Sequence, residues 1–468
     1  MDKEILNKLI RVVGSDNIIL NKSEMSKYLI EWRGVYTGKA GAIIKPKSTK
    51  EVSKILKIAY STNTPVISQG GNTGLVGGQI SFDDNHIVLN LTRLNKVREI
   101  NTLDKSITVE SGLTLLELQN VCKKNNTLFP LSLASEGTCT IGGNISTNAG
   151  GVGVLYYGNT RNLVLGLEIV TPEGKIINTL STLIKDNTGY SLKDLFIGSE
   201  GTLGVITAAT LKVFPLPKEK YTGILKVKSP QKSIKVLRFI QENISTPLTA
   251  FELMNKFSIN FVKKNIPGTV SPFNDFKWII LIEFSSLESS NEEEEKIQNL
   301  LGKLIKTDLV EDAVIAGSIR QSNEMWKLRE SISEAQKAEG GSIKNDISVP
   351  IKFIDKFIRT AISIINKIIP NSRCVIFGHI GDGNIHFNIS QPIKFNKKDF
   401  LKKEGIIRRE IVKLTMKLEG SFSAEHGVGV ARKADLKRYK KDELIIMKGI
   451  KESMDRKNIM NPGKIIDC

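Results

Sequence analysis

The stretch PVISQGGNTGLVGG, residues 65–78, decides the fold because an apolar run passes directly into a loop that holds five glycines. Glycine lets the main chain turn tightly and bring its N–H groups against an anion such as a phosphate. The motif is neither GxGxxG nor GxxxxGK followed by Ser or Thr, so the Rossmann and P-loop templates both fail. Taken alone, such a loop is a plain turn about as often as a phosphate site.

The residues around this loop predict two successive units, the first of them βαβ-like. In the first, a strand at residues 42–46 and a helix from Thr49 to Ser61 precede the strands 65–69 and 86–91. The second combines a helix over residues 113–125 and a long glycine-rich loop from Glu136 to Gly158 with strands at 106–111, 163–172 and 204–214. Pro215 and Pro217, followed by the charged KEK, mark a domain boundary at residue 217.

The second half, residues 218–468, predicts another α+β arrangement. Its expected helices cover residues 231–242, 291–306, 351–368, 401–418 and 441–454, with one more around Trp326. Its expected strands are TGILKV, WIILIEFS, ISVP, CVIFGH and NIHFNIS. The last two flank the pair Asp382–Gly383, which strongly favours a two-residue hairpin turn of type I′.

Charge and cysteine use describe an ordinary intracellular globular protein. The 468 residues include 67 Lys and Arg against 49 Asp and Glu, a formal charge of +18, but the lysines are spread along the chain without a basic aromatic stripe. A solvated surface is therefore favoured over a nucleic-acid interface, and attraction of acidic substrates or an acidic redox partner is the remaining explanation. Four cysteines without CxxC spacing argue against a disulfide framework and a zinc finger.

The amino-terminal sequence and the apolar runs predict a cytoplasmic protein without a transmembrane segment. The first residues, MDKEILNKLI, carry acids and lack the apolar region of a signal peptide. The longest apolar run, residues 278–284, is interrupted by Glu283 and is too short to span a bilayer.

A second glycine-rich loop, ASEGTCTIGGNISTNAGGVG at residues 134–153, changes the interpretation of the first, because two such loops can hold one pyrophosphate from both sides. With KDNTGYSLKDLFIGSEGTLGVIT, residues 185–207, they resemble the vanillyl-alcohol-oxidase-type FAD fold, and within it the D-2-hydroxyglutarate, D-lactate and glycolate dehydrogenases. The resemblance covers nearly the whole chain. It implies a two-lobed α+β FAD-binding domain over residues 1–217 and an α+β substrate and metal domain with an antiparallel sheet over 218–468, whose carboxyl-terminal helices return toward the flavin.

The resemblance also implies that the FAD is bound without a covalent link. Covalent members of the fold usually offer a histidine in the first glycine loop, and this loop has none. The residues that the resemblance assigns to the cofactor are Gln69, Gly70, Gly71, Asn72, Thr73, Gly74, Leu75, Gly137, Gly142, Gly143, Asn148, Gly151, Glu200, Gly204 and Ile206.

Two of the four histidines, His379 and His386, flank the Asp-Gly pair in GHIGDGNIHFN. In a two-residue hairpin they would face each other with Cβ atoms roughly 4.5–5.5 Å apart, close enough to share a metal ion. The alternative is a pair of structural histidines near a turn. The segment SAEHGVG, residues 423–429, resembles the family's metal and catalytic segment, which implies that Glu425 joins both histidines in a divalent site for zinc or manganese.

The same segment implies that His426 is the general base. A neutral imidazole can accept the hydroxyl proton of a substrate near neutral pH, while FAD takes the hydride from C2. The alternative for His426 is a buried histidine at the end of a helix.

The expected substrate contacts are Arg329, Ser333, Lys344 and Asn388. Arg329 and Ser333 stand four apart in WKLRESISEAQ, so a continuous helix would place them on one face. That face lies beside the apolar row Met325, Leu328, Ile332 and Ala335. The first three contacts match positions that resemble substrate-binding positions of D-2-hydroxyglutarate dehydrogenases, with Ser333 where threonine is usual, and Asn388 shares a strand face with His386. A surface salt bridge is the alternative for each cation.

These features predict FAD-dependent oxidation of a D-2-hydroxy acid to the 2-oxo acid, with D-2-hydroxyglutarate as the leading substrate. D-Lactate or glycolate, as in a glycolate oxidase subunit, is the alternative within the family. A biosynthetic enzyme on the same fold would leave GHIGDGNIH and SAEHG without a role, and a basic binding protein would hold no flavin. The expected electron acceptor is an electron-transfer flavoprotein or a quinone, because no NAD motif occurs, and a homodimer is an open alternative to a monomer.

Overall fold

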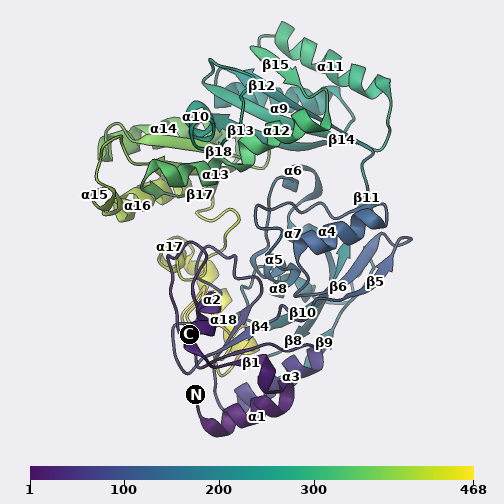
Figure 1. Cartoon of the computed structure of the whole chain (residues 1–468), viewed down its shortest axis with the longest axis vertical. Helices are drawn as coiled ribbons and strands as arrows, with labels where there is room; N and C mark the ends of the chain where they lie inside the picture. The colour runs from purple at the N-terminus through teal and green to yellow at the C-terminus, as the bar shows by residue number, and fades with distance from the viewer. The chain divides into compact units, whose positions relative to one another are not determined.

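The computed structural model describes residues 1–468, which form two compact units (Figure 1). Unit 1 comprises Met1–Gly150, Gly158–Pro215 and Glu425–Cys468, and unit 2 comprises Gly151–Tyr157 and Leu216–Ala424. The division therefore falls at Pro215 rather than at residue 217, and the last segment of the chain groups with the amino-terminal half. None of the helices combines the length and apolar composition that a membrane span requires.

The first lobe of unit 1 is a four-stranded sheet in the order β1-β2-β4-β3, with β2, β4 and β3 parallel. Its predicted helix is confirmed: α3 spans Thr49–Ser61, begins at the cap Ser48 and buries Val52, Ile55 and Leu56 in the same core as the strands. The elements are α1 (Lys3–Val13), β1 (Ile18–Ile19), α2 (Lys22–Leu29), β2 (Ala42–Ile44), α3, β3 (Val66–Gln69) and β4 (Ile87–Asn90).

The second lobe of unit 1 is an antiparallel sheet in the order β5-β6-β10-β8-β9. The predicted strands correspond to β6, β8 and β10, while the short edge strands β5 and β9 were not predicted. The elements are β5 (Val97–Asn101), β6 (Ser106–Glu110), α4 (Leu115–Lys124), β7 (Thr127–Leu128), α5 (Ile141–Thr147), α7 (Thr160–Leu163), β8 (Val164–Val170), β9 (Ile176–Asn178), α8 (Lys193–Phe196), β10 (Val205–Lys212) and β11 (Phe214–Pro215).

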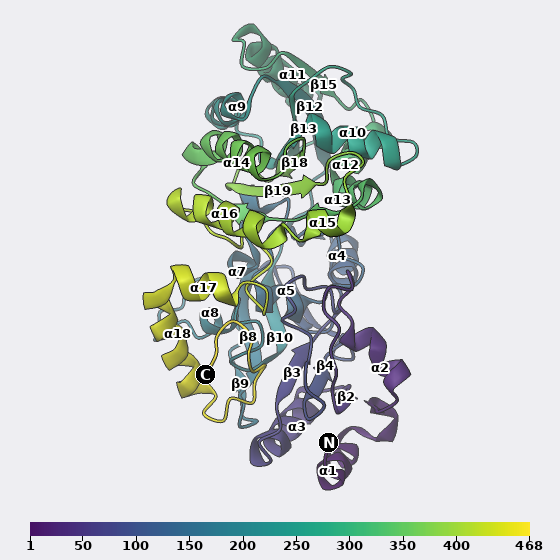
Figure 2. The ribbon, with the colours of Figure 1, turned by 90° about the vertical axis from the view of Figure 1, so that its left-hand side faces the viewer.

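Unit 1 is completed by α17 (Lys433–Tyr439) and α18 (Lys441–Met454), drawn in yellow in Figure 2. The buried Lys451 ammonium of α18 donates to the Thr202 carbonyl at 2.8 Å and to the Asp455 carboxylate at 2.5 Å. The bond to Thr202 fixes α18 to the turn that precedes β10.

Unit 2 is built on one antiparallel sheet in the order β15-β12-β14-β13-β18-β19-β16, with β17 beside β19. Alternating residues of β14 enter two cores, Ile280 and Ile282 with α9, α11 and α14, and Ile279 and Leu281 with α10, α12 and α13. The elements are α6 (Val154–Tyr157), β12 (Glu219–Val227), α9 (Pro230–Asn243), β13 (Leu248–Asn255), α10 (Lys256–Asn265), β14 (Trp278–Ser286), α11 (Asn291–Lys306), β15 (Asp312–Ile315), α12 (Ile319–Glu330), α13 (Ile332–Ala335), β16 (Ser342–Ile343), β17 (Asp346–Ser348), α14 (Ile354–Ile368), β18 (Arg373–Gly378), β19 (Asn384–Ser390), α15 (Lys397–Leu401) and α16 (Glu404–Lys417).

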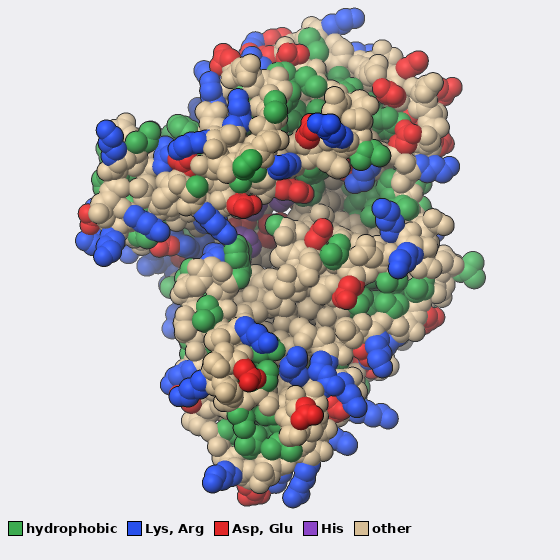
Figure 3. Space-filling view, in the orientation of Figure 1, with side chains coloured by type: hydrophobic (Ala, Val, Ile, Leu, Met, Phe, Trp, Pro, Cys, Tyr) green, Lys and Arg blue, Asp and Glu red, His purple; other side chains and the backbone are tan.

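The surface shows no single basic patch on the face drawn in Figure 3, where Lys and Arg side chains are interspersed with Asp and Glu. This distribution is that of a solvated charged surface, as the spread of lysines along the sequence predicts.

Candidate active site

The two glycine loops of unit 1 pack directly against each other. A Cβ atom at Gly70 would lie 2.1 Å from the Thr140 hydroxyl oxygen, and one at Gly71 would lie 1.9 Å from the Thr138 carbonyl oxygen. Only glycine fits at these two positions, because any side chain would separate the loops. The loops are therefore adjacent, as the paired-loop interpretation requires.

Several features of these loops fit a bound polar cofactor. Asn72, Asn148 and Glu200, all assigned to FAD by the resemblance, have left-handed main-chain conformations with φ of 57°, 51° and 49°. The buried Asn72 Oδ1 and Ser111 Oγ atoms have no hydrogen-bond partner within the chain. Buried polar atoms are rarely left unsatisfied, so a bound group with polar atoms of its own explains both.

The remaining predicted FAD residues occupy three places. Gln69 ends β3, and its side-chain amide donates to the carbonyls of Tyr28 and Gln79. Thr73, Gly74 and Leu75 are half-buried in the first loop. Gly137, Gly142 and Gly143 lie in the second loop or α5, and Gly204 and Ile206 at the start of β10. Gly151 is the exception, since it belongs to the short segment that groups with unit 2.

The Glu200 side chain points toward the chain segment that follows His426. Its Oε1 atom accepts a hydrogen bond from the Val428 N–H at 2.7 Å, and its Oε2 atom accepts one from the Gly429 N–H at 2.8 Å. Burial raises the pKa of Glu200 to about 7, although the two N–H groups and the nearby Lys464 ammonium act in the opposite direction.

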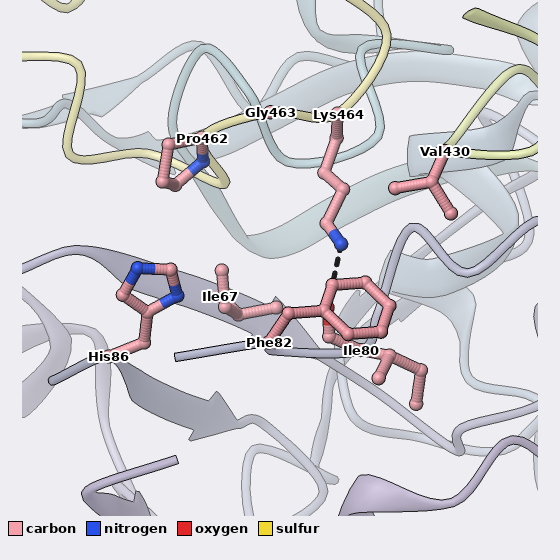
Figure 4. Close-up of a pocket in the computed structure, with 8 residues that line it drawn as sticks. All are labelled: Ile67, Ile80, Phe82, His86, Val430, Pro462, Gly463 and Lys464. Carbon is pink, nitrogen blue, oxygen red and sulfur yellow. Dashed lines mark hydrogen bonds between the residues drawn. The ribbon is translucent and has the colours of Figure 1, made fainter. Parts of the chain in front are cut away.

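A cavity of about 130 Å³ lies next to this segment in unit 1 (Figure 4). The buried Lys464 ammonium above it donates to the Ile80 carbonyl at 2.7 Å and lies 4.2 Å from the centre of the Phe82 ring. The lining residues are Ile67, Ile80, Phe82, His86, Val430, Pro462, Gly463 and Lys464. None of them is a predicted cofactor or substrate residue, so the cavity is not the candidate active site.

The histidine pair of unit 2 is close together, but the predicted hairpin register is wrong. Phe377, not His379, lies opposite His386 across β18 and β19. A type I′ turn needs a positive φ at both central residues, and of Asp382 and Gly383 only Gly383 has one, at 90°. The connection therefore runs from His379 to Gly383. The two imidazole rings still approach edge to face, with centroids 5.5 Å apart and ligating nitrogens within 4.8 Å of each other.

A buried carboxylate lies beside each histidine. His379 Nδ1 is 2.5 Å from Glu252 Oε1, and His386 Nδ1 is 3.6 Å from Asp346 Oδ1, which also accepts a bond from the Asn384 amide at 2.9 Å. Carboxylates on Nδ1 orient an imidazole so that Nε2 is its ligand atom, which is the usual arrangement around a metal-binding histidine. His379 has this arrangement through Glu252, so the donor atoms present are compatible with a divalent ion.

Arg329 shares the Glu252 carboxylate with His379. Its Nε atom donates to Glu252 Oε2 at 2.6 Å, and its guanidinium carbon lies 4.8 Å from the centre of the Phe377 ring. Burial alone would raise the pKa of Glu252, but His379 and Arg329 reverse this effect and lower it to about 2. The structure thus brings Arg329 to the histidine pair, with its positive charge balanced by Glu252.

The other predicted substrate residues are placed differently. The apolar row on α12 and α13 is buried as predicted, but the helix is interrupted at Ser331, so Arg329 is buried while Ser333 is exposed. The prediction that these two share one helix face is therefore wrong. Lys344 is half-buried between β16 and β17. The Asn388 amide donates to Gln336 Oε1 at 2.9 Å and accepts from the Asn345 N–H at 3.3 Å.

Glu425 and His426 are half-buried at the start of the last segment of unit 1. Their roles as metal ligand and general base stay predictions. Glu252 and Asp346 were not predicted at all. In the sequence, Glu252 could have been noticed as the single charged residue of the largely apolar stretch LTAFELMN.

Comparison with known proteins gives full-length matches. Residues 40–180 match the FAD binding domain family, and residues 216–465 match the C-terminal domain of FAD linked oxidases. The mitochondrial D-2-hydroxyglutarate dehydrogenase of Danio rerio is 36% identical over 438 residues, which are 93% of this chain and 80% of that protein. The D-2-hydroxyglutarate dehydrogenase of Stutzerimonas stutzeri is 32% identical over 469 residues, with 99% of each chain covered.

Solved structures with low sequence identity share the fold. Substrate-bound p-cresol methylhydroxylase aligns with a TM-score of 0.77 and 15% identity over 99% of this chain and 96% of its own. Alkyldihydroxyacetonephosphate synthase aligns with a TM-score of 0.75 and 17% identity, covering 99% of this chain and 85% of its own. The expected α+β fold is therefore confirmed.

Proposed function

The chain belongs to the FAD-linked oxidase family that includes the D-2-hydroxyglutarate dehydrogenases, and we propose that it oxidises D-2-hydroxyglutarate to 2-oxoglutarate. The observation that carries the proposal is the buried group of unit 2 in which Arg329 and His379 share the Glu252 carboxylate beside His386. It combines a cation suited to a carboxylate with an oriented histidine pair.

The residues of this group, together with His426, Glu425 and FAD, have separate roles in the proposed reaction. The Nη atoms of Arg329 bind a substrate carboxylate, while Glu252 fixes the guanidinium plane through Nε. His426 accepts the proton of the C2 hydroxyl. FAD, when bound at the glycine loops, supplies the acceptor for the hydride that leaves C2. A divalent ion, zinc or manganese, held by His379, His386 and Glu425 would supply positive charge beside the hydroxyl oxygen.

The flavin is expected to leave the protein on denaturation, because the first glycine loop offers no histidine for a covalent link. The purified protein should be yellow because it contains FAD. Acid precipitation should release this FAD into the supernatant. The measurement is the flavin absorbance of supernatant and pellet. Colour retained in the washed pellet would show a covalent flavin and contradict this proposal.

The site is expected to prefer a dicarboxylate over D-lactate. Glu252 already balances Arg329, so this preference depends on Lys344 as a second cation for the distal carboxylate. A hydrogen bond to a charged group contributes about 1.5–3 kcal/mol, which corresponds to kcat/KM on the order of 10–100-fold higher for D-2-hydroxyglutarate.

The matched test is Lys344→Met, which keeps the length of the side chain and removes its charge. The ratio of kcat/KM for the two substrates should fall toward unity in this variant. Equal values for both substrates in the unmodified enzyme would favour a D-lactate or glycolate dehydrogenase instead.

The acceptor, the assembly state and the location stay proposals. We keep an electron-transfer flavoprotein or a quinone as the acceptor and a homodimer as an alternative to the monomer. A cytoplasmic location agrees with four cysteines that form no disulfide, although several relatives are named as mitochondrial proteins.

A further inference from the structure

The chain segment that follows His426 is held on both sides by main-chain and side-chain bonds within unit 1. The two carboxylate oxygens of Glu200 accept hydrogen bonds from the N–H groups of Val428 and Gly429, at 2.7 and 2.8 Å. The Gly429 carbonyl accepts from the Ile465 N–H at 3.0 Å. Glu200 therefore holds the main chain two and three residues after His426.

Glu200 is itself rigidly placed. Its main chain has a φ of 49°, its N–H donates to the Ser146 carbonyl at 2.8 Å, and its carbonyl accepts from the Asn461 amide at 2.7 Å. The residue is 9% exposed. A buried side chain with a fixed backbone can define the position of whatever binds it.

The fit between Glu200 and the segment is close. A Cβ atom at Gly427 would lie 2.7 Å from Glu200 Oε1, and Gly427 has a φ of 80° that disfavours any side chain. The glycine next to His426 therefore lets the carboxylate approach the main chain directly.

We propose that Glu200 is a positioning residue for His426: its carboxylate fixes the main chain two residues after the imidazole and so sets where that imidazole meets the substrate. This inference rests on the proposed function, in which His426 is the general base. The resemblance assigns Glu200 to the cofactor, whereas the structure directs both of its carboxylate oxygens to the His426 segment.

The chemistry of the side chain gives a graded series of variants. A carboxylate offers an acceptor oxygen to each N–H group, Glu200→Gln keeps the shape but offers only one acceptor, and Glu200→Ala offers none. A displacement of about 1 Å in a catalytic group can cost on the order of 10²-fold in rate. We therefore expect kcat to fall on the order of 10-fold in Glu200→Gln and 100-fold in Glu200→Ala, with KM changed much less.

Glu168 is the matched control. It is 8% exposed in the same unit, and it binds Thr49, Thr207 and Arg98 instead of the His426 segment. Glu168→Gln should therefore lower the unfolding midpoint as Glu200→Gln does, while kcat stays near that of the unmodified protein.

The experiment measures three quantities on the flavin-loaded enzyme and the three variants: bound flavin, kcat and KM for D-2-hydroxyglutarate, and amide hydrogen exchange of residues 427–431. The expected result is unchanged flavin, the graded loss of kcat, and exchange of the Val428 and Gly429 amides that is at least 10-fold faster in Glu200→Ala and unchanged in Glu168→Gln. The hydrogen-exchange measurement needs no substrate. An unmodified enzyme that fails to oxidise D-2-hydroxyglutarate would therefore reject the proposed function, while hydrogen exchange would still test whether Glu200 holds this segment.

Three results would overturn the inference. Full kcat in Glu200→Ala would show that the carboxylate does not position His426. Loss of flavin in parallel with activity would assign Glu200 to the cofactor instead. Equal loss of kcat in the Glu168 and Glu200 variants would show a general effect of stability.

Discussion

Exhaustive chelation is expected to abolish D-2-hydroxyglutarate oxidation and leave the flavin bound. The proposed ligands His379 and His386 lie in unit 2 and Glu425 lies in unit 1, and none of the three is a residue assigned to FAD, so the two functions should separate. Because a bound divalent ion supplies several kcal/mol of charge stabilisation, the loss should be on the order of 10³-fold or more. Activity should return when zinc or manganese is added back.

His386→Ala is likewise expected to abolish oxidation and keep the flavin. The variant removes one proposed ligand, so it should be yellow, with little metal and little activity. His86→Ala is the matched control, because His86 is the histidine that lies outside both proposed sites. Metal content by elemental analysis and flavin content by absorbance check each variant. Full activity of a protein shown to contain no metal would return His379 and His386 to a structural role.

His426→Ala is expected to lower kcat on the order of 10²–10⁴-fold while metal and flavin stay bound. General-base catalysis typically contributes this much, and the variant keeps every proposed metal ligand. It should therefore resemble His386→Ala in colour and differ from it in metal content. Steady-state kinetics with D-2-hydroxyglutarate and elemental analysis of the same preparation distinguish the two.

A second arm tests the proton-transfer role directly. Imidazole added to His426→Ala should restore part of the lost rate, since a free base can occupy the space of the missing side chain. Loss of the metal from this variant would make His426 a ligand, and unchanged kcat would remove it from the mechanism.

Periodic segments with clear ends were predictable from the sequence. The bounds of α3, α11, β19 and α18 are those expected, and α3 and α11 begin at the serine caps Ser48 and Ser290. Two expectations failed at local irregularities. The helix that carries Arg329 breaks at Ser331, and the Asp-Gly pair ends a longer connection instead of forming the whole turn.

The candidate site was only half predictable. The histidines were found because GHIGDGNIHFN is a distinctive motif, but their carboxylate partners come from elsewhere in the chain. Glu252 lies on β13, a strand that was not predicted, and it reaches His379 through the pairing of β13 with β18. Such a partner depends on strand order in the sheet, which hydrophobic periodicity does not contain.

Anaerobic titration of the purified yellow protein with D-2-hydroxyglutarate tests the central claim most directly, because flavin reduction reports oxidation of the substrate without any added acceptor. The account predicts that about one equivalent of D-2-hydroxyglutarate bleaches the visible flavin band and yields 2-oxoglutarate, while D-lactate at the same concentration bleaches it far more slowly. Flavin that stays oxidised with D-2-hydroxyglutarate, or that is bleached equally fast by D-lactate, would contradict it.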